Sequence, residues 1–271
     1  MDKREHWSHS QLKTLLDCPL LYKFKYLEKR EPEFTPDYFP FGNAVHEAHK
    51  ALCNAFREGR ELSEADAQKT FGEAWEILGA DPMLRFGKND WGDLLNLGLE
   101  MVKVLHKEMP REKVVAIDSE FNVPLITGGG EILERPLNGI FDLIVQGQDG
   151  LTVVDFKTAS KKYSPADVAT DMQATAYLLA APHVFDGAGK VSFRFDVITK
   201  AKRPAFVSYP TERTGQDIAR LVSLFQQAER EIAAGVFLPR RSWRCKSCSY
   251  ETACAAWAPQ EREAAVVANT R

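Results

Sequence analysis

Hydrophobic residues in the first 110 positions recur at helical spacing. The leucines that follow Ser10 predict a helix that is interrupted at Cys18-Pro19 and continues to about Leu27. Residues 31–40 contain three prolines, so we expect an irregular loop there. Further helices are predicted over residues 43–57, 63–78 and 90–108. This part of the chain is therefore expected to be mainly α-helical.

The pattern then changes to segments rich in β-branched and aromatic residues. Glycine-rich turns at 128–130 and 147–150 separate the first of these segments, which predicts an antiparallel meander. Strands are predicted over residues 114–123, 136–146, 151–158, 191–199 and 205–209. Two helices, 166–181 and 214–234, complete the pattern.

Composition narrows the possible classes of protein. A chain of 271 residues is long enough for one sizeable core, and its net charge of -3 excludes a uniformly basic surface for nucleic acid. No apolar run is long enough to span a membrane, and the amino terminus lacks a signal-peptide pattern, so a cytoplasmic protein is expected. Five cysteines, an odd number, make a disulfide framework improbable there.

The predicted hairpin concentrates charged residues on a hydrophobic strand. Strand alternation places Asp155 and Lys157 on one face. Asp142 on the preceding strand lies opposite Asp155 if the turn is at 148–149, and opposite Lys157 if it is at 149–150. Either register puts the three side chains on the same face, because a slip of two residues preserves the face.

Two carboxylates held close together favour a cation between them. A divalent ion that prefers oxygen ligands, Mg²⁺ or Mn²⁺, fits this need better than zinc. Such an ion activates water and polarises a phosphate, and a lysine balances charge in the transition state. The residues alone leave a second interpretation open, since Asp-x-Lys also occurs as a charge pair on a solvated strand face.

Three elements in order, 139–142 (GIFD), 155–158 (DFKT) and 173–177 (QATAY), resemble the PD-(D/E)XK nuclease superfamily, and specifically its RecB-like exonuclease branch. The resemblance implies a metal site formed by Asp142, Asp155 and the backbone carbonyl of Phe156, with Lys157 assisting catalysis. It implies an α/β fold of the restriction-endonuclease type, with a mixed central sheet flanked by helices and an all-α insertion.

The resemblance extends to residues outside the hairpin. Residues 41–47 (FGNAVHE) resemble the G-x-x-x-H-E element of that branch, which implies that His46 is a further metal ligand. Gln173 and Tyr177 match its Q-x-x-x-Y motif, and their spacing places both on one helical face. They are expected to bind DNA or support the site, with packing in the core as the alternative. Glu120 is not assigned to the site.

A second constellation consists of cysteines. Cys245, Cys248 and Cys254 form a C-x2-C-x5-C triplet, which leaves one ligand position open, and Cys18 is the candidate for it. Cys53 is expected in the core. The element around Cys18, residues 8–22, resembles the amino-terminal signature of the AddB nuclease domain and of RecB-like nucleases of CRISPR adaptation. This resemblance implies a structural [4Fe-4S] cluster that joins the two chain ends, with Zn²⁺ as the alternative occupant.

Short basic groups accompany these motifs and are expected to line a groove for DNA. They stand at 161–162, 200–203 and 240–244, and Tyr22, Phe24 and Tyr26 interleave with Lys23 and Lys25. We expect one nuclease domain over 1–260, a helical insertion at about 58–110, a cysteine lobe from 8–28 and 236–257, and a tail at 261–271.

The expected activity is metal-dependent exonucleolytic hydrolysis of DNA with single strands or free ends. The setting would be recombination, repair, phage or CRISPR-related DNA processing. The alternative is a DNA-end binding or structure-specific endonuclease subunit of a larger complex. The sequence contains no G-x-x-x-x-G-K-[ST] phosphate loop, so any motor would be a helicase or recombination partner.

Overall fold

The computed structural model describes residues 5–147, 149–185, 187 and 189–257. Its centre is a five-stranded mixed sheet in the order β3-β4-β5-β6-β7. The strands are β3 (Val114–Val123), β4 (Leu137–Gln146), β5 (Gly150–Ala159), β6 (Lys190–Thr199) and β7 (Phe206–Thr211). All neighbours are antiparallel except β5 and β6, which pair in parallel along ten residues each. A parallel pair needs a crossover, which α6 (Pro165–Thr170) and α7 (Met172–Val184) provide.

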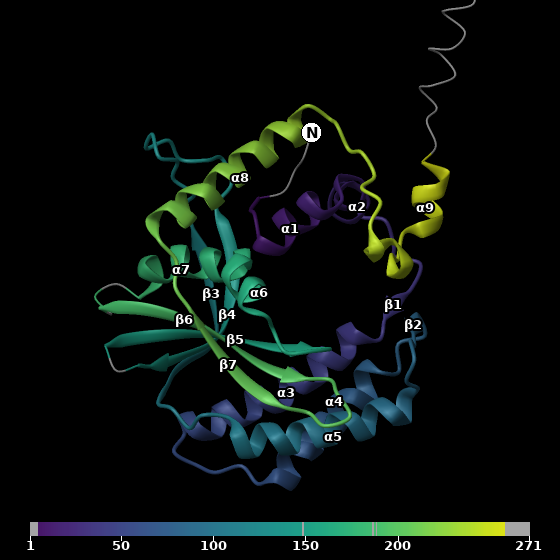
Figure 1. Cartoon of the computed structure of the whole chain (residues 1–271), viewed down its shortest axis with the longest axis vertical. Helices are drawn as coiled ribbons and strands as arrows, with labels where there is room; N and C mark the ends of the chain where they lie inside the picture. The colour runs from purple at the N-terminus through teal and green to yellow at the C-terminus, as the bar shows by residue number, and fades with distance from the viewer. Residues whose placement is uncertain (1–4, 148, 186, 188, 258–271) are drawn as a thin grey trace, which may run out of the picture.

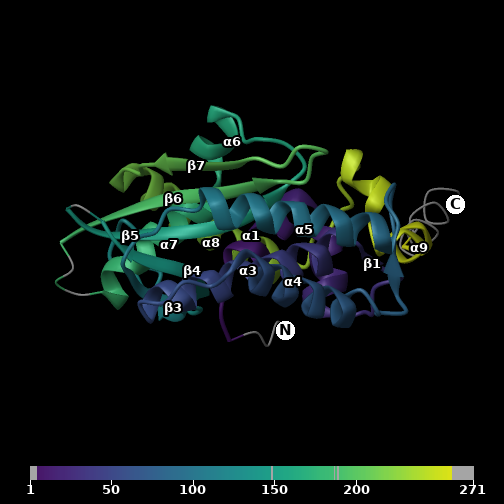
Figure 2. The same cartoon turned by 90° about the horizontal axis from the view of Figure 1, so that it is seen from below.

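Helices cover both faces of this sheet (Figure 1). One hydrophobic cluster joins a sheet face to α7, α1 (His9–Asp17) and α8 (Gly215–Ala233). A second cluster joins the opposite face to α3 (Tyr38–Arg57), α4 (Glu64–Leu78) and α5 (Trp91–Glu108), which Figure 2 shows from below. The expected mixed α/β architecture with flanking helices is confirmed.

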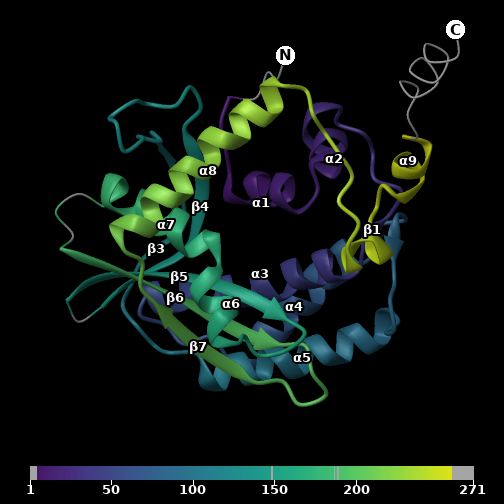
Figure 3. The same cartoon turned by 45° about the horizontal axis from the view of Figure 1, so that its top comes forward.

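The segment that follows α1 and the carboxy-terminal segment meet beside the helical layer (Figure 3). The amino-terminal part comprises α2 (Pro19–Tyr22), a π-helical turn (Lys23–Leu27) and β1 (Thr35–Pro36), which pairs in parallel with β2 (Leu84–Arg85). The carboxy-terminal part comprises a 3-10 turn (Trp243–Ser247) and α9 (Glu251–Ala256). Glu33 joins them, because its N–H donates to the carbonyl of Ser249 and its carboxylate accepts from the N–H of Thr252.

Two predictions of secondary structure were wrong. Residues 31–40 are not all irregular, because α3 already begins at Tyr38 and holds Pro40 in its first turn, where the missing N–H costs no hydrogen bond. The helix expected over 166–181 is two helices, because Asp171 adopts an extended backbone and caps α7 by accepting from the N–H of Gln173.

Within the described ranges, no helix combines the length and the apolar character needed to cross a membrane. The expected tail at 261–271 lies outside the described residues.

Candidate functional site

Strands β4 and β5 separate at the two aspartates. Their pairing runs from Gln146↔Leu151 to Leu143↔Val154 and, if continued, places Asp142 opposite Asp155. Instead of a further ladder bond, the N–H of Phe156 donates to Oδ2 of Asp142 at 3.0 Å. The register is the one expected for a turn at 148–149; residue 148 itself lies outside the described residues.

Asp155 is a buried acid held by two neighbours. It has no exposed surface, and its Oδ1 accepts from Nε2 of Gln173 at 2.6 Å. Nζ of Lys157 lies 2.8 Å from Oδ2, yet from a direction that leaves this oxygen without a well-directed hydrogen bond. Burial raises the pKa of Asp155 to about 7, although the charge of Lys157 opposes that rise. A buried carboxylate oxygen without a hydrogen bond is a position suited to a cation.

His46 reaches the same place from α3. Its Nε2 lies 3.3 Å from Oδ2 of Asp142. Burial lowers the pKa of His46, but the contact with Asp142 outweighs it, so the net shift is upward. For Asp142 the signs are opposite. Burial raises its pKa, but His46 and Lys157 outweigh burial, so the net shift is downward. The helix approaches β5 closely because Gly42 has no side chain: a Cβ there would lie 3.0 Å from Oγ1 of Thr158.

Behind the site, His49 packs against the catalytic strand. Its ring stacks on Phe156 with centroids 4.1 Å apart and planes within 2° of parallel, and Sγ of Cys53 lies 3.6 Å from its Nε2. Burial lowers the pKa of His49 to about 3, so the ring is neutral. Cys53 is buried, as expected. His49 was not singled out from the sequence, although it follows His46 by one helical turn.

Gln173 and Tyr177 form a buried chain beneath Asp155. Nε2 of Gln173 lies 3.0 Å from the hydroxyl of Tyr177, which donates to the carbonyl of Ile140 at 2.7 Å. Both side chains are buried, and Tyr177 is only 4% exposed. This placement favours the site-supporting role over direct contact with DNA. It depends on the break at Asp171, because that break puts Gln173 in the first turn of α7.

His9 on α1 lies beside Tyr177 at the edge of the site. This residue was not singled out from the sequence. Its ring meets that of Tyr177 edge-on at 5.9 Å. Burial, followed by the charge of Lys157, lowers the pKa of His9 to about 4. A cavity of about 440 Å³ opens here and joins His9 and Gln173 to the segment after β5. Its lining also includes Lys13, Ala159, Ser160, Lys161, Asp167 and Arg244.

Asp118 is a further acid near the site. It lies on β3 with a left-handed φ of 49°, at a gap in the pairing with β4 where Asp142 would be its partner. It forms an ion pair with Lys50, and its charge raises the pKa of His46. Glu120, which was not assigned to the site, is exposed on the same strand.

Imidazole, two carboxylates and a backbone carbonyl are a donor set suited to Mg²⁺ or Mn²⁺. In the described part of the chain, however, no three His, Cys, Asp or Glu side chains are arranged to hold an ion. His46 and Lys157 instead supply the protons that contact Asp142 and Asp155. Oδ2 of Asp155, which is buried and approached by the ammonium of Lys157 without a well-directed hydrogen bond, is the observation that fits a cation.

The four cysteines of the second constellation line one cavity of about 120 Å³. Cys18 comes from the start of α2, Cys245 and Cys248 from the 3-10 turn and its end, and Cys254 from α9. Its walls include Leu20, Phe24 and Tyr250, which form a small hydrophobic cluster. Burial raises the pKa of Cys248 and Cys254, and the other cysteines of the cavity add to the rise.

One part of the expected DNA groove was wrong. Tyr22 and Phe24 are buried, because α2 and the following π-helical turn face the hydrophobic clusters rather than solvent. Of the predicted basic groups, Lys161 and Arg244 do line the larger cavity.

Three comparisons with known proteins bear on this site. A model of the PD-(D/E)XK nuclease superfamily matches residues 6–255. The chain is 25% identical to the gene 69 protein of Mycobacterium phage L5, over 91% of this chain and 95% of the phage protein. It superimposes on the crystal structure of a candidate exonuclease from Eubacterium rectale with a TM-score of 0.53 and 15% identity, covering 91% of this chain and 88% of the other.

Proposed function

Because this chain belongs to the PD-(D/E)XK nuclease superfamily, we propose that it hydrolyses phosphodiester bonds of DNA at the point where β4 and β5 separate. The observation that carries this proposal is the buried Asp155, whose Oδ2 has no well-directed hydrogen bond and lies 2.8 Å from Nζ of Lys157. A buried acid paired with an ammonium, and joined to the larger cavity through Gln173, is equipment for phosphate chemistry.

The proposed ion is Mg²⁺ or Mn²⁺. Its ligands would be the side chains of His46, Asp142 and Asp155 and the backbone carbonyl of Phe156. When bound, the ion supplies the Lewis acidity that activates water and offsets phosphate charge. His46 must be neutral at Nε2 to act as a ligand, so binding requires it to release the proton that Asp142 favours.

Lys157 and Gln173 assist this centre as hydrogen-bond donors. The pKa of Lys157 is raised by the two aspartates, so its Nζ stays protonated and can donate to a phosphate oxygen as charge accumulates in the transition state. Nε2 of Gln173 donates to Oδ1 of Asp155, which fixes the carboxylate with Oδ2 beside Nζ of Lys157. Tyr177 holds Gln173 in turn, so the pair acts as a support for the acid.

We further propose exonucleolytic action on single strands or free ends, in the RecB-like branch. The support is the cavity beside Gln173, which is bounded by α1, α6 and the carboxy-terminal 3-10 turn. The helical layer at 58–110 is proposed as an insertion into a domain that spans 1–260. A helicase or recombination partner would supply any unwinding.

The cysteine cavity is proposed to hold a [4Fe-4S] cluster, with Zn²⁺ as the alternative. Four half-buried thiols around one cavity support a cofactor that joins 8–28 to 236–257. Anaerobic purification distinguishes the two: a brown protein with iron and sulfide indicates the cluster, a colourless one with zinc indicates the alternative, and a protein free of both contradicts the proposal.

Hydrolysis is tested with end-labelled DNA, both single-stranded and duplex, in Mg²⁺, Mn²⁺ or EDTA. We expect degradation that EDTA abolishes and that Asp155→Ala and Lys157→Ala each reduce by several orders of magnitude, while the exposed Lys103→Ala retains it. Degradation that is unaffected by EDTA and by both variants would rule out this mechanism. Cutting of circular plasmid would replace the exonuclease assignment by an endonuclease.

A further inference from the structure

Three large aromatic side chains are exposed near the cavity that Gln173, the partner of Asp155, lines. Tyr38 and Phe39, in the first turn of α3, are 43% and 55% exposed, and their ring centroids lie 4.5 Å apart. Trp243, at the start of the carboxy-terminal 3-10 turn, is 76% exposed. Exposing such rings forfeits hydrophobic stabilisation, so a cluster of them marks a surface that binds something.

These rings lie next to the active strand. The N–H of Lys200 donates to the carbonyl of Ala159 at 2.7 Å, which ties the end of β6 to β5 two residues beyond Lys157. Nζ of Lys200 lies 5.7 Å from the centroid of the Tyr38 ring. The first turn of α3 therefore stands beside the end of the strand that carries Asp155 and Lys157.

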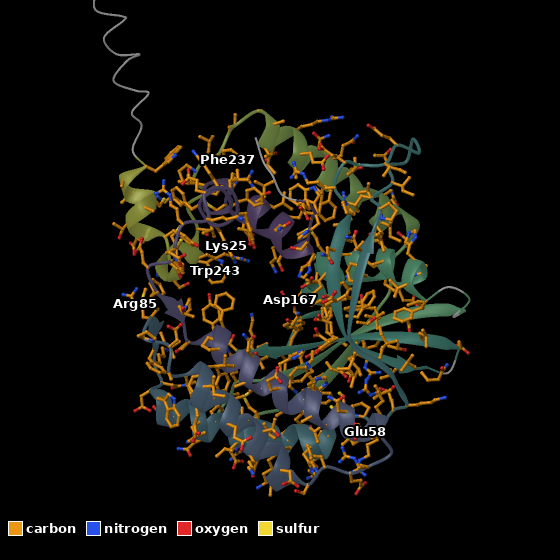
Figure 4. The ribbon with its side chains drawn as sticks, turned by 180° about the vertical axis from the view of Figure 1, so that it is seen from behind. Lys25, Glu58, Arg85, Asp167, Phe237 and Trp243 are labelled. Carbon is orange, nitrogen blue, oxygen red and sulfur yellow. The ribbon has the colours of Figure 1, made fainter. Side chains whose placement is uncertain are left out.

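The carboxy-terminal turn faces the same opening. Arg244 lines the 440 Å³ cavity together with His9. Burial raises the pKa of the Tyr38 phenol, and the positive charge of Arg244 opposes that rise. Figure 4 shows Trp243 and Asp167 on opposite sides of the opening at the centre of the molecule, and Asp167 lines the cavity as well. Tyr38, with Phe39 against it, and Trp243 thus flank the cavity that Gln173 lines.

Tyr38 and Phe39 on one side of the cavity and Trp243 on the other form its rim, and each side carries a cation beside a ring. The guanidinium of Arg244 lies 5.3 Å from the centroid of Trp243, and Lys200 occupies the corresponding position over Tyr38. Arg244 is held by an ion pair with Asp17 on α1. Alternating rings and cations match the alternating bases and phosphates of a nucleic-acid strand. An apolar protein partner would not be matched by these cations.

We propose that Tyr38, Phe39 and Trp243 form a stacking platform for the bases of single-stranded DNA, with Arg244 and Lys200 contacting its phosphates. The inference rests on the proposed function, since it places the platform where a strand would enter the nuclease site. Only an unpaired strand fits, because the base faces of a duplex are covered by their neighbours in the helix. The platform therefore selects single strands over duplex DNA before any bond is broken.

The test measures binding of fluorescently labelled 20-nucleotide single strands and 20-base-pair duplexes without divalent metal, with recovery of intact oligonucleotide as a check. The variants are Trp243→Ala, Tyr38→Ala and Phe39→Ala in the full chain. Trp243→Phe keeps a stacking ring, and Ile132→Ala, an exposed apolar residue in the segment between β3 and β4, is the matched control. Each alanine variant is expected to weaken single-strand binding roughly 5- to 150-fold. Duplex binding should change less than about twofold, and Trp243→Phe should restore most of the loss.

The outcomes separate this inference from the proposed function. Equal weakening of single-strand and duplex binding, or no weakening of either, would overturn the platform. A small chromogenic phosphodiester, which has no bases to stack, should be hydrolysed equally by wild type and by the exposed Lys103→Ala variant. If neither protein hydrolyses it or DNA, the proposed function fails, while the binding ratio still decides the platform.

Discussion

At the scale of single residues, the site is organised around one carboxylate that the protein does not fully satisfy. Gln173 fixes one oxygen of Asp155, and Lys157 approaches the other without a well-directed bond. The hairpin pattern predicted that Asp142, Asp155 and Lys157 would project together. It could not predict the burial of Asp155, because that burial depends on how α7, which supplies Gln173, packs on the sheet.

Gln173→Ala should remove the donor to Oδ1 of Asp155 and leave a misaligned acid. We expect kcat on DNA to fall about 10- to 100-fold with little change in KM, because the support acts on the reacting group and not on the strand. Gln68→Ala, which removes a contact inside the helical layer, is the control for loss of a buried amide. A rise in KM at constant kcat would instead indicate that Gln173 binds DNA.

His49 should make the metal-free protein sensitive to acid. Its folded pKa of about 3 lies below the ordinary value of 6.5, so the unfolded chain takes up the proton first as the pH falls. The stability that the neutral ring contributes is complete above pH 6.5 and is lost as the pH falls from there towards 3.

His49→Phe keeps a ring against Phe156 and removes this titration. Between neutral pH and about pH 5, wild type should lose about 2 kcal/mol more unfolding free energy than the variant. Urea unfolding at several pH values measures the difference, and the exposed His183→Gln is the control. Parallel pH curves for wild type and His49→Phe would contradict the assignment.

At the scale of elements, local periodicity predicted most of the helices and strands, but three features depended on tertiary contacts. The helix over 166–181 breaks at Asp171 because Arg213 binds the carbonyls of Val168 and Asp171 and the hydroxyl of Thr175. The parallel pairing of β5 with β6 follows from the crossover through α6 and α7. Helix α3 begins at Tyr38, directly after β1, where the chain is fixed by the pairing of β1 with β2 and by the hydrogen bond from Gly87 to Asp37.

Arg213→Lys tests the junction between α6 and α7. A lysine cannot reach the two carbonyls and the hydroxyl at once, because it lacks the planar fork of donors. We expect a loss of about 2 kcal/mol in urea unfolding and a fall in activity, since Gln173 follows the junction. Arg220→Lys on the exposed side of α8 should change neither quantity. An unaltered Arg213→Lys protein would show that the junction holds without these bonds.

The helical layer offers a matched pair of glycines with opposite expected effects. A Cβ at Gly98 in α5 would lie 1.8 Å from the ring of Phe71, whereas a Cβ at Gly72 in α4 meets nothing within 4 Å. Gly98→Ala should therefore destabilise the protein by about 1–3 kcal/mol through overpacking. Gly72→Ala should stabilise it by about 0.5–1 kcal/mol through helix propensity. Thermal unfolding of both variants checks the signs, and equal signs would contradict this packing.

At the scale of the whole molecule, the chain ends converge on the cysteine cavity beside the proposed platform. The cysteine triplet left one position for which Cys18 was the candidate, and the resemblance to iron-sulfur nucleases implied that the chain ends meet. The structure brings all four cysteines to one cavity. Spacing could not predict the exposed rim, because Tyr38, Phe39 and Trp243 are each ordinary apolar residues in sequence. Their exposure follows only from where α3 and the carboxy-terminal turn begin in the folded chain.

Cys18→Ser should remove the proposed cofactor and release the carboxy-terminal segment. Since a link from Cys18 to the triplet closes most of the chain into a loop, we expect the Tm to fall by roughly 10 °C or more. Metal and sulfide content should fall with it. Cys53→Ser, in the core behind His49, should keep the cofactor. Equal metal content in wild type and Cys18→Ser would exclude this cysteine as a ligand.

The distance in sequence between Cys18 and Cys245 also determines how long after Cys18 the ribosome adds Cys245. At about 5–20 residues per second, a ribosome needs roughly 10 to 45 seconds to produce the residues between them. Until then the nascent chain can hold the two aspartates and Lys157 on a formed hairpin, but it lacks Trp243, Arg244 and three of the four thiols. A translation product that stops before these residues would carry the catalytic groups without the rim that is proposed to choose their substrate.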